Sequence, residues 1–223
     1  MALVIAHRGA SAYELENTLA AFRLAVEMGA DGVELDVHGT ADSEFVVHHD
    51  EEIRGMRIAN VTLDELRREP LRNGEKVPTL TEALGDLGTA VSVHVEVKAL
   101  PPALDEQLFD CLDKGPTPDT YHVHSFDHRI IRRLANRRPD FSYGVLSVSV
   151  PIQPELQWLD AGANTLWQQQ QFIDGDLLTV AHEQGCKVFA WTVDDPSRMM
   201  ELVSLGVDAV CTNKPDVARK TLD

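Results

Sequence analysis

Two acidic residues lie two positions apart in an apolar run near the N-terminus. Glu34 and Asp36 alternate with Val33, Leu35 and Val37. Because alternate residues of a β-strand point to the same face, a strand here would hold both carboxylates side by side. Neighbouring carboxylates repel each other, and their burial is costly unless a cation lies between them. The pair therefore predicts a site for a hard cation.

Further charged residues end two other apolar runs. Glu96 and Lys98 have the same spacing of two, and His7 and Arg8 end the first apolar run. Three carboxylates with open coordination positions suit one divalent cation, Mg²⁺ or Ca²⁺, since these ions take oxygen ligands and retain waters. Arg8 offers a planar fork and Lys98 a point charge, which suit a phosphate bound beside that cation.

Histidines supply a second kind of chemistry. The segment Phe45–Asp50 ends in His48, His49 and Asp50, so it can bring an imidazole to the same place. His7 and His49, on different strands, suit a base and an acid, each typically worth about 10²–10⁴ in rate. A zinc site made of His7, His48 and His49 is the alternative, and the carboxylates count against it. Together these residues predict hydrolysis of a phosphate ester.

Four further side chains, one tryptophan and three histidines, lie outside these motifs. Trp191, near the end of a later strand, would either line a substrate pocket or pack in the core. His122 and His124 alternate along one strand and are expected to be a packed or solvated pair, with a minor substrate role open for His124. His38 is expected at the surface.

Eight apolar segments alternate with helical stretches and would position these residues. The expected strands are 3–7, 32–37, 91–98, 121–125, 142–146, 164–167, 187–193 and 209–212. Asn17 suits the N-cap of a helix over 18–28, and Pro196 and Pro215 suit first helical turns. Such a βα series closes most simply into a (β/α)₈ TIM barrel, an α/β fold whose active site lies at the C-terminal ends of the strands. A doubly wound open sheet is the alternative.

One part of the chain departs from this alternation. Too few residues separate the second strand from Phe45 for a helical crossover, so 45–49 is expected to fold back antiparallel. Capping boxes at Thr62–Glu65 and Thr79–Glu82 predict two helix starts. We expect 39–78 to be an insertion between strand 2 and its helix, within one barrel domain covering 1–223.

Composition and net charge limit the kinds of molecule that this chain is expected to bind. The chain has 223 residues, 43% of them hydrophobic, and a net charge of −16, which argues against nucleic acid or an anionic membrane as partner. No apolar run approaches the roughly 20 residues of a membrane span. The N-terminus has neither a basic flank nor a cleavage site, and three scattered cysteines read as reduced. A cytoplasmic location is expected.

Longer motifs make the sequence recognisable. It resembles the glycerophosphodiester phosphodiesterase family in the motifs HRG, ENTLAAF, GADGVELDV, VVHHD, PTLTEAL, VEVK, HSF, WTV and GVDAVCTNKPD, which span nearly the whole chain. The resemblance implies a (β/α)₈ barrel with an insertion after the second strand. It also implies hydrolysis of a small-molecule glycerophosphodiester to sn-glycerol 3-phosphate and an alcohol with a divalent cation. By their motif positions, His7 and His49 are implied to be the catalytic pair. Glu34, Asp36 and Glu96 are implied to be the metal ligands, and Arg8 and Lys98 the phosphate contacts.

Some positions depart from the family pattern. Leu15 replaces a usual proline, and Arg54-Gly55-Met56 stands where a DRTTNG-like run is usual, so the preferred alcohol stays open. A lysophospholipase D-like enzyme is one rival; it would need an apolar surface near the mouth, and Pro70–Pro78 is polar. A non-catalytic barrel that binds a phosphorylated metabolite is the other. The sequence decides neither the oligomeric state, nor which histidine is the acid, nor a cyclic phosphate intermediate.

Overall fold

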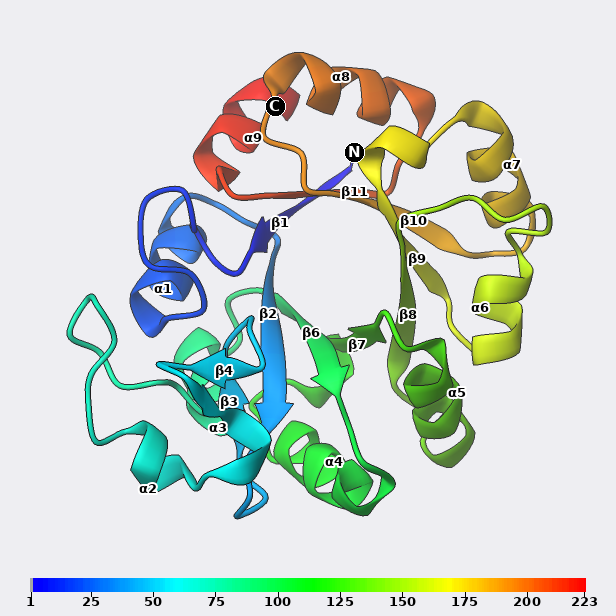
Figure 1. Cartoon of the computed structure of the whole chain (residues 1–223). Coiled ribbons are helices and arrows are strands. Elements are labelled where there is room, and N and C mark those ends of the chain that lie inside the picture. The colour runs from blue at the N-terminus through cyan, green and yellow to red at the C-terminus, as the bar shows by residue number, and fades with distance from the viewer. Residues whose placement is uncertain (1) are drawn as a thin grey trace.

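Eight parallel strands form a closed barrel in the computed structural model, which describes residues 2–223. β1 pairs with both β11 and β2, so the ring has no free edge and is not an open doubly wound sheet (Figure 1). The expected (β/α)₈ TIM barrel is therefore confirmed. The barrel strands are β1 (Leu3–His7), β2 (Gly32–Gly39), β6 (Ser92–Ala99), β7 (Tyr121–Ser125), β8 (Ser142–Ser147), β9 (Thr165–Gln169), β10 (Lys187–Trp191) and β11 (Ala209–Thr212).

Helices surround this ring and cover its outer surface (Figure 1). The α-helices outside the insertion are α1 (Leu19–Glu27), α3 (Leu80–Leu87), α4 (Asp105–Asp113), α5 (His128–Arg137), α6 (Leu156–Ala161), α7 (Gly175–Glu183), α8 (Pro196–Leu205) and α9 (Pro215–Leu222). Single 3₁₀ turns lie at η2 (Pro102–Leu104), η3 (Pro118–Thr120) and η4 (Gln170–Phe172). Each helix buries an apolar face, such as Ile130, Ile131 and Leu134 of α5. The main core lies between the strands and this helical layer.

A second, smaller core fills the barrel itself, because alternate strand residues point inward. It consists of Ile5, Leu146, Trp167, Phe189, Ala209 and Cys211. In the N-terminal half of the interior, His94 stacks on His122 with ring centroids 4.5 Å apart. Trp167 and Phe189 meet the His94 ring edge-on. Aromatic and imidazole rings thus fill the interior below the charged C-terminal mouth.

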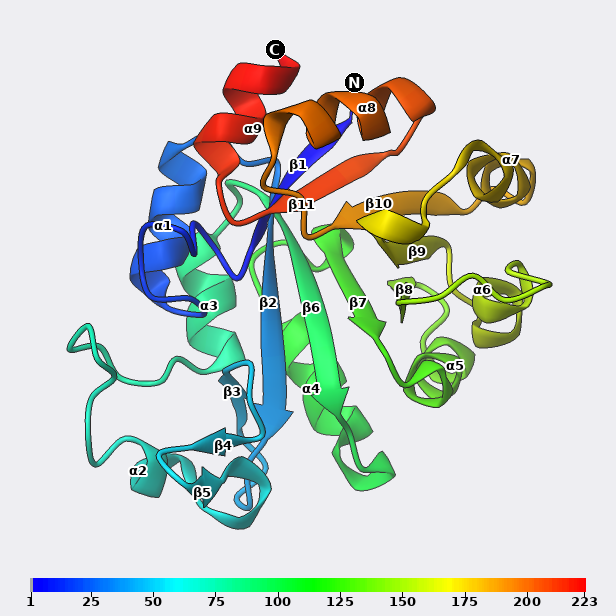
Figure 2. The same cartoon turned by 45° about the horizontal axis from the view of Figure 1, so that its top comes forward.

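The chain leaves the barrel between β2 and α3, over residues 40–79. This insertion holds β3 (Phe45–Val47), β4 (Glu52–Ile53), β5 (Met56–Arg57), η1 (Ile58–Asn60) and α2 (Leu63–Leu66), and it projects beyond the end of β2 (Figure 2). β3 pairs antiparallel with β2, as the short connection predicts. Both predicted capping boxes are present. A separate cluster that includes Val46, Ile58 and Leu66 stabilises the segment.

One helix start differs from the prediction. Thr18, not Asn17, caps α1, and its Oγ1 accepts a hydrogen bond from the Ala21 N–H. Asn17 adopts a positive φ of 57° and directs its side chain into the barrel. Within residues 2–223, no helix combines the length and the apolar character needed to cross a bilayer.

Candidate active site

The first strand, β1, ends in a turn whose residues contact the carboxylates of the neighbouring strand β2. Arg8 has a φ of 57° and Gly9 a φ of 81°. A Cβ on Gly9 would lie 2.7 Å from the Ala21 backbone, so only glycine fits there. The turn lets the Arg8 N–H donate to Glu34 Oε2 at 3.0 Å. It also brings Arg8 Nε to 3.1 Å from Asp36 Oδ2. HRG therefore anchors both carboxylates of β2.

Lys98 joins the carboxylates of two strands. Its Nζ lies 2.8 Å from Asp36 Oδ1 and 2.6 Å from Glu96 Oε1. Asn17 Nδ2 donates to Asp36 Oδ2 at 2.8 Å. Asp36 thus has both oxygens engaged by Lys98, Arg8 and Asn17, although its side chain is fully buried.

The three carboxyl groups differ in their readiness to ionise. Burial, followed by repulsion from Asp36 and Glu96, raises the pKa of Glu34 well above its usual value. Burial and then Asp36 raise the pKa of Glu96 to about 7. Burial alone would raise the pKa of Asp36, but Lys98 and Arg8 outweigh it and the net shift is downward. Two cationic side chains therefore do not fully compensate three carboxylates, and a divalent cation fits this charge pattern.

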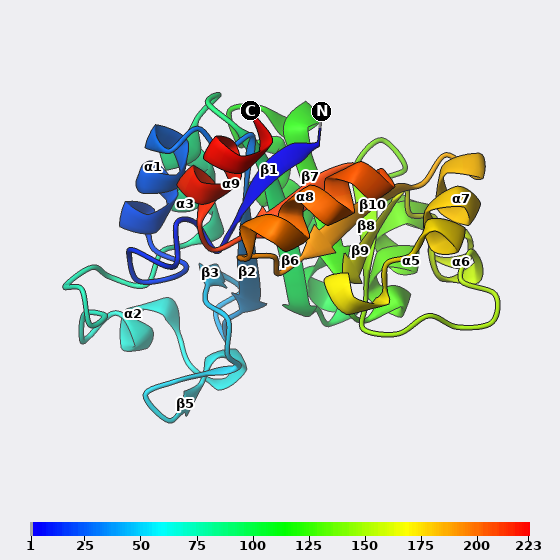
Figure 3. The same cartoon turned by 90° about the horizontal axis from the view of Figure 1, so that it is seen from above.

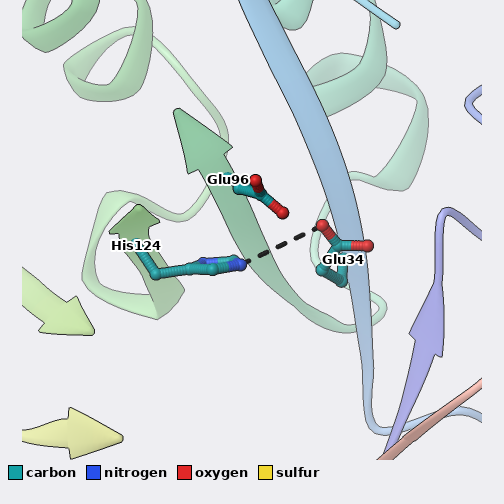
Figure 4. A group of neighbouring side chains, drawn as sticks. All are labelled: Glu34, Glu96 and His124. Atoms are coloured by element: carbon teal, nitrogen blue, oxygen red, sulfur yellow. Dashed lines mark ion pairs between the residues drawn. The ribbon is translucent and has the colours of Figure 1, made fainter. Parts of the chain in front are cut away.

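Glu34, Glu96 and His124 form a compact group of buried donors. One ligand atom from each lies within 4.8 Å of the other two. Figure 4 shows the three side chains pointing toward one another from β2, β6 and β7. Burial lowers the pKa of His124 to about 3, so its imidazole is neutral. Carboxylate and neutral imidazole are both metal ligands, so these three side chains form a candidate site for a divalent cation.

His7 is held by a chain of polar groups from the other end of the sequence. Its Nδ1 lies 2.8 Å from Asn213 Oδ1. Asn213 Nδ2 in turn donates to Asp194 Oδ2 at 2.6 Å. Since the Asn213 oxygen faces His7, His7 Nδ1 must carry the proton, and Nε2 keeps a free lone pair. Burial, then the Arg8 charge, lowers the pKa of His7, so the ring is neutral near pH 7.

His49 lies two residues after the end of β3, within the insertion. Its Nδ1 lies 2.8 Å from Asp50 Oδ1. The hydrogen bond from His49 lowers the pKa of Asp50, so that carboxylate stays ionised. His38 Nε2 approaches the His49 carbonyl oxygen at 3.1 Å and fixes its backbone. His49 thus presents Nε2 at the mouth.

These side chains surround one cavity of about 250 Å³ at the C-terminal end of the barrel. It is lined by His7, Arg8, Glu34, His49, Glu96, Lys98, His124, Phe126, Leu146, Trp167, Trp191 and Cys211. Trp191 donates through Nε1 to the Trp167 carbonyl oxygen at 3.0 Å and meets Phe126 edge-on. A second cavity, of about 630 Å³, lies beside the first between the β1–α1 loop and the insertion, and His48 lines it.

Known proteins resemble this chain over nearly its whole length. The model of the glycerophosphoryl diester phosphodiesterase family matches residues 7–217. A glycerophosphodiester phosphodiesterase of Caldanaerobacter subterraneus is 32% identical over 230 residues, which cover 96% of this chain and 95% of that protein. The chain belongs to this family. It is accordingly an enzyme, a phosphoric diester hydrolase of the glycerophosphodiester phosphodiesterase type.

Solved structures extend the comparison to the fold. A glycerophosphodiester phosphodiesterase from Parabacteroides distasonis superposes with a TM-score of 0.88 at 28% identity, covering 98% of this chain and 95% of that one. A phosphodiesterase from Oleispira antarctica, solved in complex with the product sn-glycerol-3-phosphate, gives a TM-score of 0.90 at 26% identity, with 99% and 96% covered. The phosphodiesterase described here has the same barrel.

The structure brings most of the predicted site residues of this phosphodiesterase to one cavity. His7, Arg8, Glu34, His49, Glu96, Lys98 and Trp191 all line it. Asp36 is not among the lining residues and contacts Arg8 and Lys98 instead. His48 faces the neighbouring cavity. For Trp191 the sequence left two alternatives open, lining a substrate pocket or packing in the core, and in the structure it lines the cavity.

Sequence reasoning missed several polar residues around the site. Asn213 and Asp194 follow β11 and β10 and meet His7 only because β1 closes the barrel against β11. The TNKPD motif was the available signal for Asn213. His38 is buried rather than at the surface, because the His49 backbone covers it. His124 belongs to the carboxylate group rather than to a packed pair with His122.

Proposed function

We propose that this enzyme hydrolyses glycerophosphodiesters to sn-glycerol 3-phosphate and an alcohol, with histidine acid/base catalysis and one divalent cation. The single observation that supports it most is the cavity that holds a neutral imidazole, two cationic side chains and buried carboxylates together. The product bound to the Oleispira antarctica phosphodiesterase supports the glycerol phosphate half of the substrate.

Glu34, Asp36 and Glu96 would hold the cation, since three carboxylates beside two basic side chains leave a negative excess. Oxygen ligands alone favour Mg²⁺ or Ca²⁺. When bound, the cation supplies charge compensation for the phosphoryl oxygens. Lys98 and Arg8, which pair with these carboxylates in the structure, would then contact the phosphate.

His7 would act as the base. Its Nδ1 proton is committed to Asn213, so the Nε2 lone pair is free to take a proton from the nucleophile. That nucleophile is either the glycerol 2-hydroxyl, which gives a cyclic phosphate for water to open, or water itself. In both routes the same imidazole removes the proton.

His49 would act as the acid. Asp50 accepts the Nδ1 hydrogen bond and orients the ring, so Nε2 can protonate the departing alkoxide. The alcohol would leave toward the 630 Å³ cavity, because its lining residues Glu16, His48 and Asp50 adjoin Arg8 and His49. The glycerol would lie toward Phe126 and Trp191 on the other side.

A panel of glycerophosphodiesters tests this proposal. Glycerophosphocholine, glycerophosphoethanolamine and glycerophosphoglycerol are incubated with Mg²⁺, Ca²⁺, Mn²⁺ or EDTA, and glycerol 3-phosphate is measured enzymatically. We expect its release with a divalent cation and loss of release in EDTA. Full turnover in EDTA would contradict metal dependence. Release of phosphocholine in place of glycerol 3-phosphate would contradict the assigned cleavage.

An exposed apolar rim favours a second candidate, a lysophospholipase D-like reaction. Val148, Val150 and Ile152 of the β8–α6 connection are exposed, as is Phe126, which also lines the cavity. This connection and the insertion lie on opposite sides of the barrel, as Figure 3 shows. An acyl chain on the glycerol would leave the cavity past Phe126 and contact that rim. Choline release from lysophosphatidylcholine, compared with release from glycerophosphocholine, separates the two activities.

A further inference from the structure

The imidazole of His124 is buried without a hydrogen-bond partner. The residue is 1% exposed, and within residues 2–223 neither Nδ1 nor Nε2 has a partner. Its ring lies flat against Trp167, with centroids 4.3 Å apart and an interplanar angle of 8°. Stacking fixes the ring plane but satisfies neither nitrogen. A buried polar group without a partner needs an explanation, and a bound ion is one of those that would satisfy it.

The ring edge points at two carboxyl groups. His124 Nε2 lies 4.0 Å from Glu34 Oε1, which is too far for a hydrogen bond (Figure 4). Ligands bind a divalent ion at about 2.0–2.2 Å, so two ligands of one ion lie about 3 Å apart at a right angle and about 4.3 Å apart when opposite. The observed separation lies inside that range. Glu96 completes a group whose donor atoms are all within 4.8 Å of one another.

Asp36 and His94, which lie nearby, each have at least one hydrogen-bond partner. Asp36 contacts Lys98, Arg8 and Asn17. Deeper in the barrel, the His94 Nε2 contacts the Ser92 hydroxyl at 3.1 Å, and the His122 ring stacks on His94. His124 is the imidazole that faces the carboxylates with both nitrogens unpartnered.

We propose that His124 is a nitrogen ligand of the divalent cation, together with Glu34 and Glu96, and that it directs the site toward first-row transition metals. Mg²⁺ and Ca²⁺ take oxygen ligands, whereas imidazole suits Zn²⁺ and its transition-metal neighbours. A mixed carboxylate and imidazole set therefore favours Mn²⁺, Co²⁺ or Zn²⁺ over Ca²⁺. This inference rests on the cation site of the proposed function and adds a ligand and a selectivity to it.

Mn²⁺ serves as the probe, because its pulsed electron paramagnetic resonance spectrum reports a directly bound nitrogen. Chelator-treated enzyme is titrated with Mn²⁺ and with Ca²⁺ by calorimetry, and ¹⁴N modulation is recorded on the Mn²⁺ complex. H124Q removes the imidazole at the carboxylate group. H122Q is the matched control, since it removes an imidazole from the same strand that stacks on His94.

We expect ¹⁴N modulation in the wild type and in H122Q, and none in H124Q. Loss of an outer hydrogen-bond partner of a metal ligand already costs about 10–100-fold in affinity, so H124Q should bind Mn²⁺ at least about tenfold more weakly. Its Ca²⁺ affinity should change by less than about threefold, since oxygen ligands dominate there. If circular dichroism shows H124Q unfolded, H124N replaces it.

Three results would overturn the inference: no nitrogen coupling in the wild-type Mn²⁺ complex, coupling that persists in H124Q, or equal Mn²⁺ affinity in both proteins. Absent coupling in the wild-type spectrum overturns the inference without any variant, and coupling that is present is assigned to His124 by its loss in H124Q. Absent coupling together with Ca²⁺-dependent release of glycerol 3-phosphate would refute the role of His124 and leave the proposed function standing. Full turnover in EDTA with no cation bound would refute both.

Discussion

Both ends of the barrel interior contain histidines, in very different surroundings. At the C-terminal mouth, His7 and His49 each have an Nδ1 partner and line a cavity. In the N-terminal half, His94 and His122 stack on each other within a shell of aromatic rings. Histidine occurs at both ends, so the role of each histidine is set by its surroundings. What matters is which group contacts one ring nitrogen and whether the other ring nitrogen faces open space.

Charge separates the two ends as well. The mouth holds three carboxyl groups against Arg8 and Lys98. In the N-terminal half of the interior, burial and then the neighbouring histidines hold the pKa of His94 well below its usual value. Burial lowers the pKa of His122 to about 4. Both imidazoles are thus neutral packing groups. A metal ion or an anionic substrate is therefore expected to bind at the mouth, where the charged side chains lie.

The largest predicted difference between the ends is in turnover. His7→Ala and His49→Ala should each lower kcat for glycerophosphocholine by about 10²–10⁴, the usual worth of an acid or base. His122→Ala is the matched control from the N-terminal half of the interior and should stay within a few-fold of the wild type. The measurement is the initial rate of glycerol 3-phosphate release at saturating cation. Near-normal rates for either mouth variant would remove the distinction between the two ends.

Residues in the N-terminal half of the barrel interior should contribute to the stability of the fold rather than to turnover. Phe189 is buried inside the barrel and meets Trp167 and His94 edge-on. Phe189→Ala should lower the free energy of unfolding by about 3–5 kcal/mol, the usual cost of removing a buried aromatic ring. Urea unfolding followed by circular dichroism measures this loss. The folded fraction should retain kcat within a few-fold; a loss of kcat as large as that of His7→Ala would show that the ring supports the chemistry directly.

Local sequence signals were sufficient for the scaffold. Barrel strands are buried on both faces, so runs such as Val4–Ala6 read as continuous apolar segments, and Pro196 and Pro215 lie in the first turns of their helices as predicted. Asn17 was predicted wrongly because asparagine suits both an N-cap and a left-handed turn; Thr18 takes the cap and frees Asn17 for Asp36.

The site's supporting contacts depend on closure of the ring, which no local pattern encodes. His7 and Asn213 are 206 positions apart and meet through the pairing of β1 with β11. His124 alternates with His122 along β7, and only the packing of β7 against β6 places it by Glu96. Motif resemblance predicted the residues at the mouth, while tertiary contacts determine which of their atoms stay free.

Asn213→Ala should have an intermediate effect, because it leaves His7 in place and removes the acceptor that fixes its tautomer. A small misplacement of a catalytic group can cost about 10²-fold, so we expect kcat to fall about 10–100-fold with KM changed by less than about threefold. Asn213→Asp keeps an acceptor at the same position and should restore part of the rate. Equal loss in both variants would indicate that the position supports the loop rather than the imidazole.

The smallest expected effect is a displacement of the acidic limb of the pH–rate profile. As base, His7 must be neutral, so kcat/KM falls when the pH drops through the pKa of His7. Burial, followed by the Arg8 charge, lowers that pKa from 6.5, while the hydrogen bond to Asn213 raises it in part. The acidic limb at saturating cation should therefore lie below pH 6.5. Asn213→Ala removes the raising contribution and should move the limb to still lower pH. A wild-type limb centred above pH 6.5 would mean that a different group, with different neighbours, takes the proton.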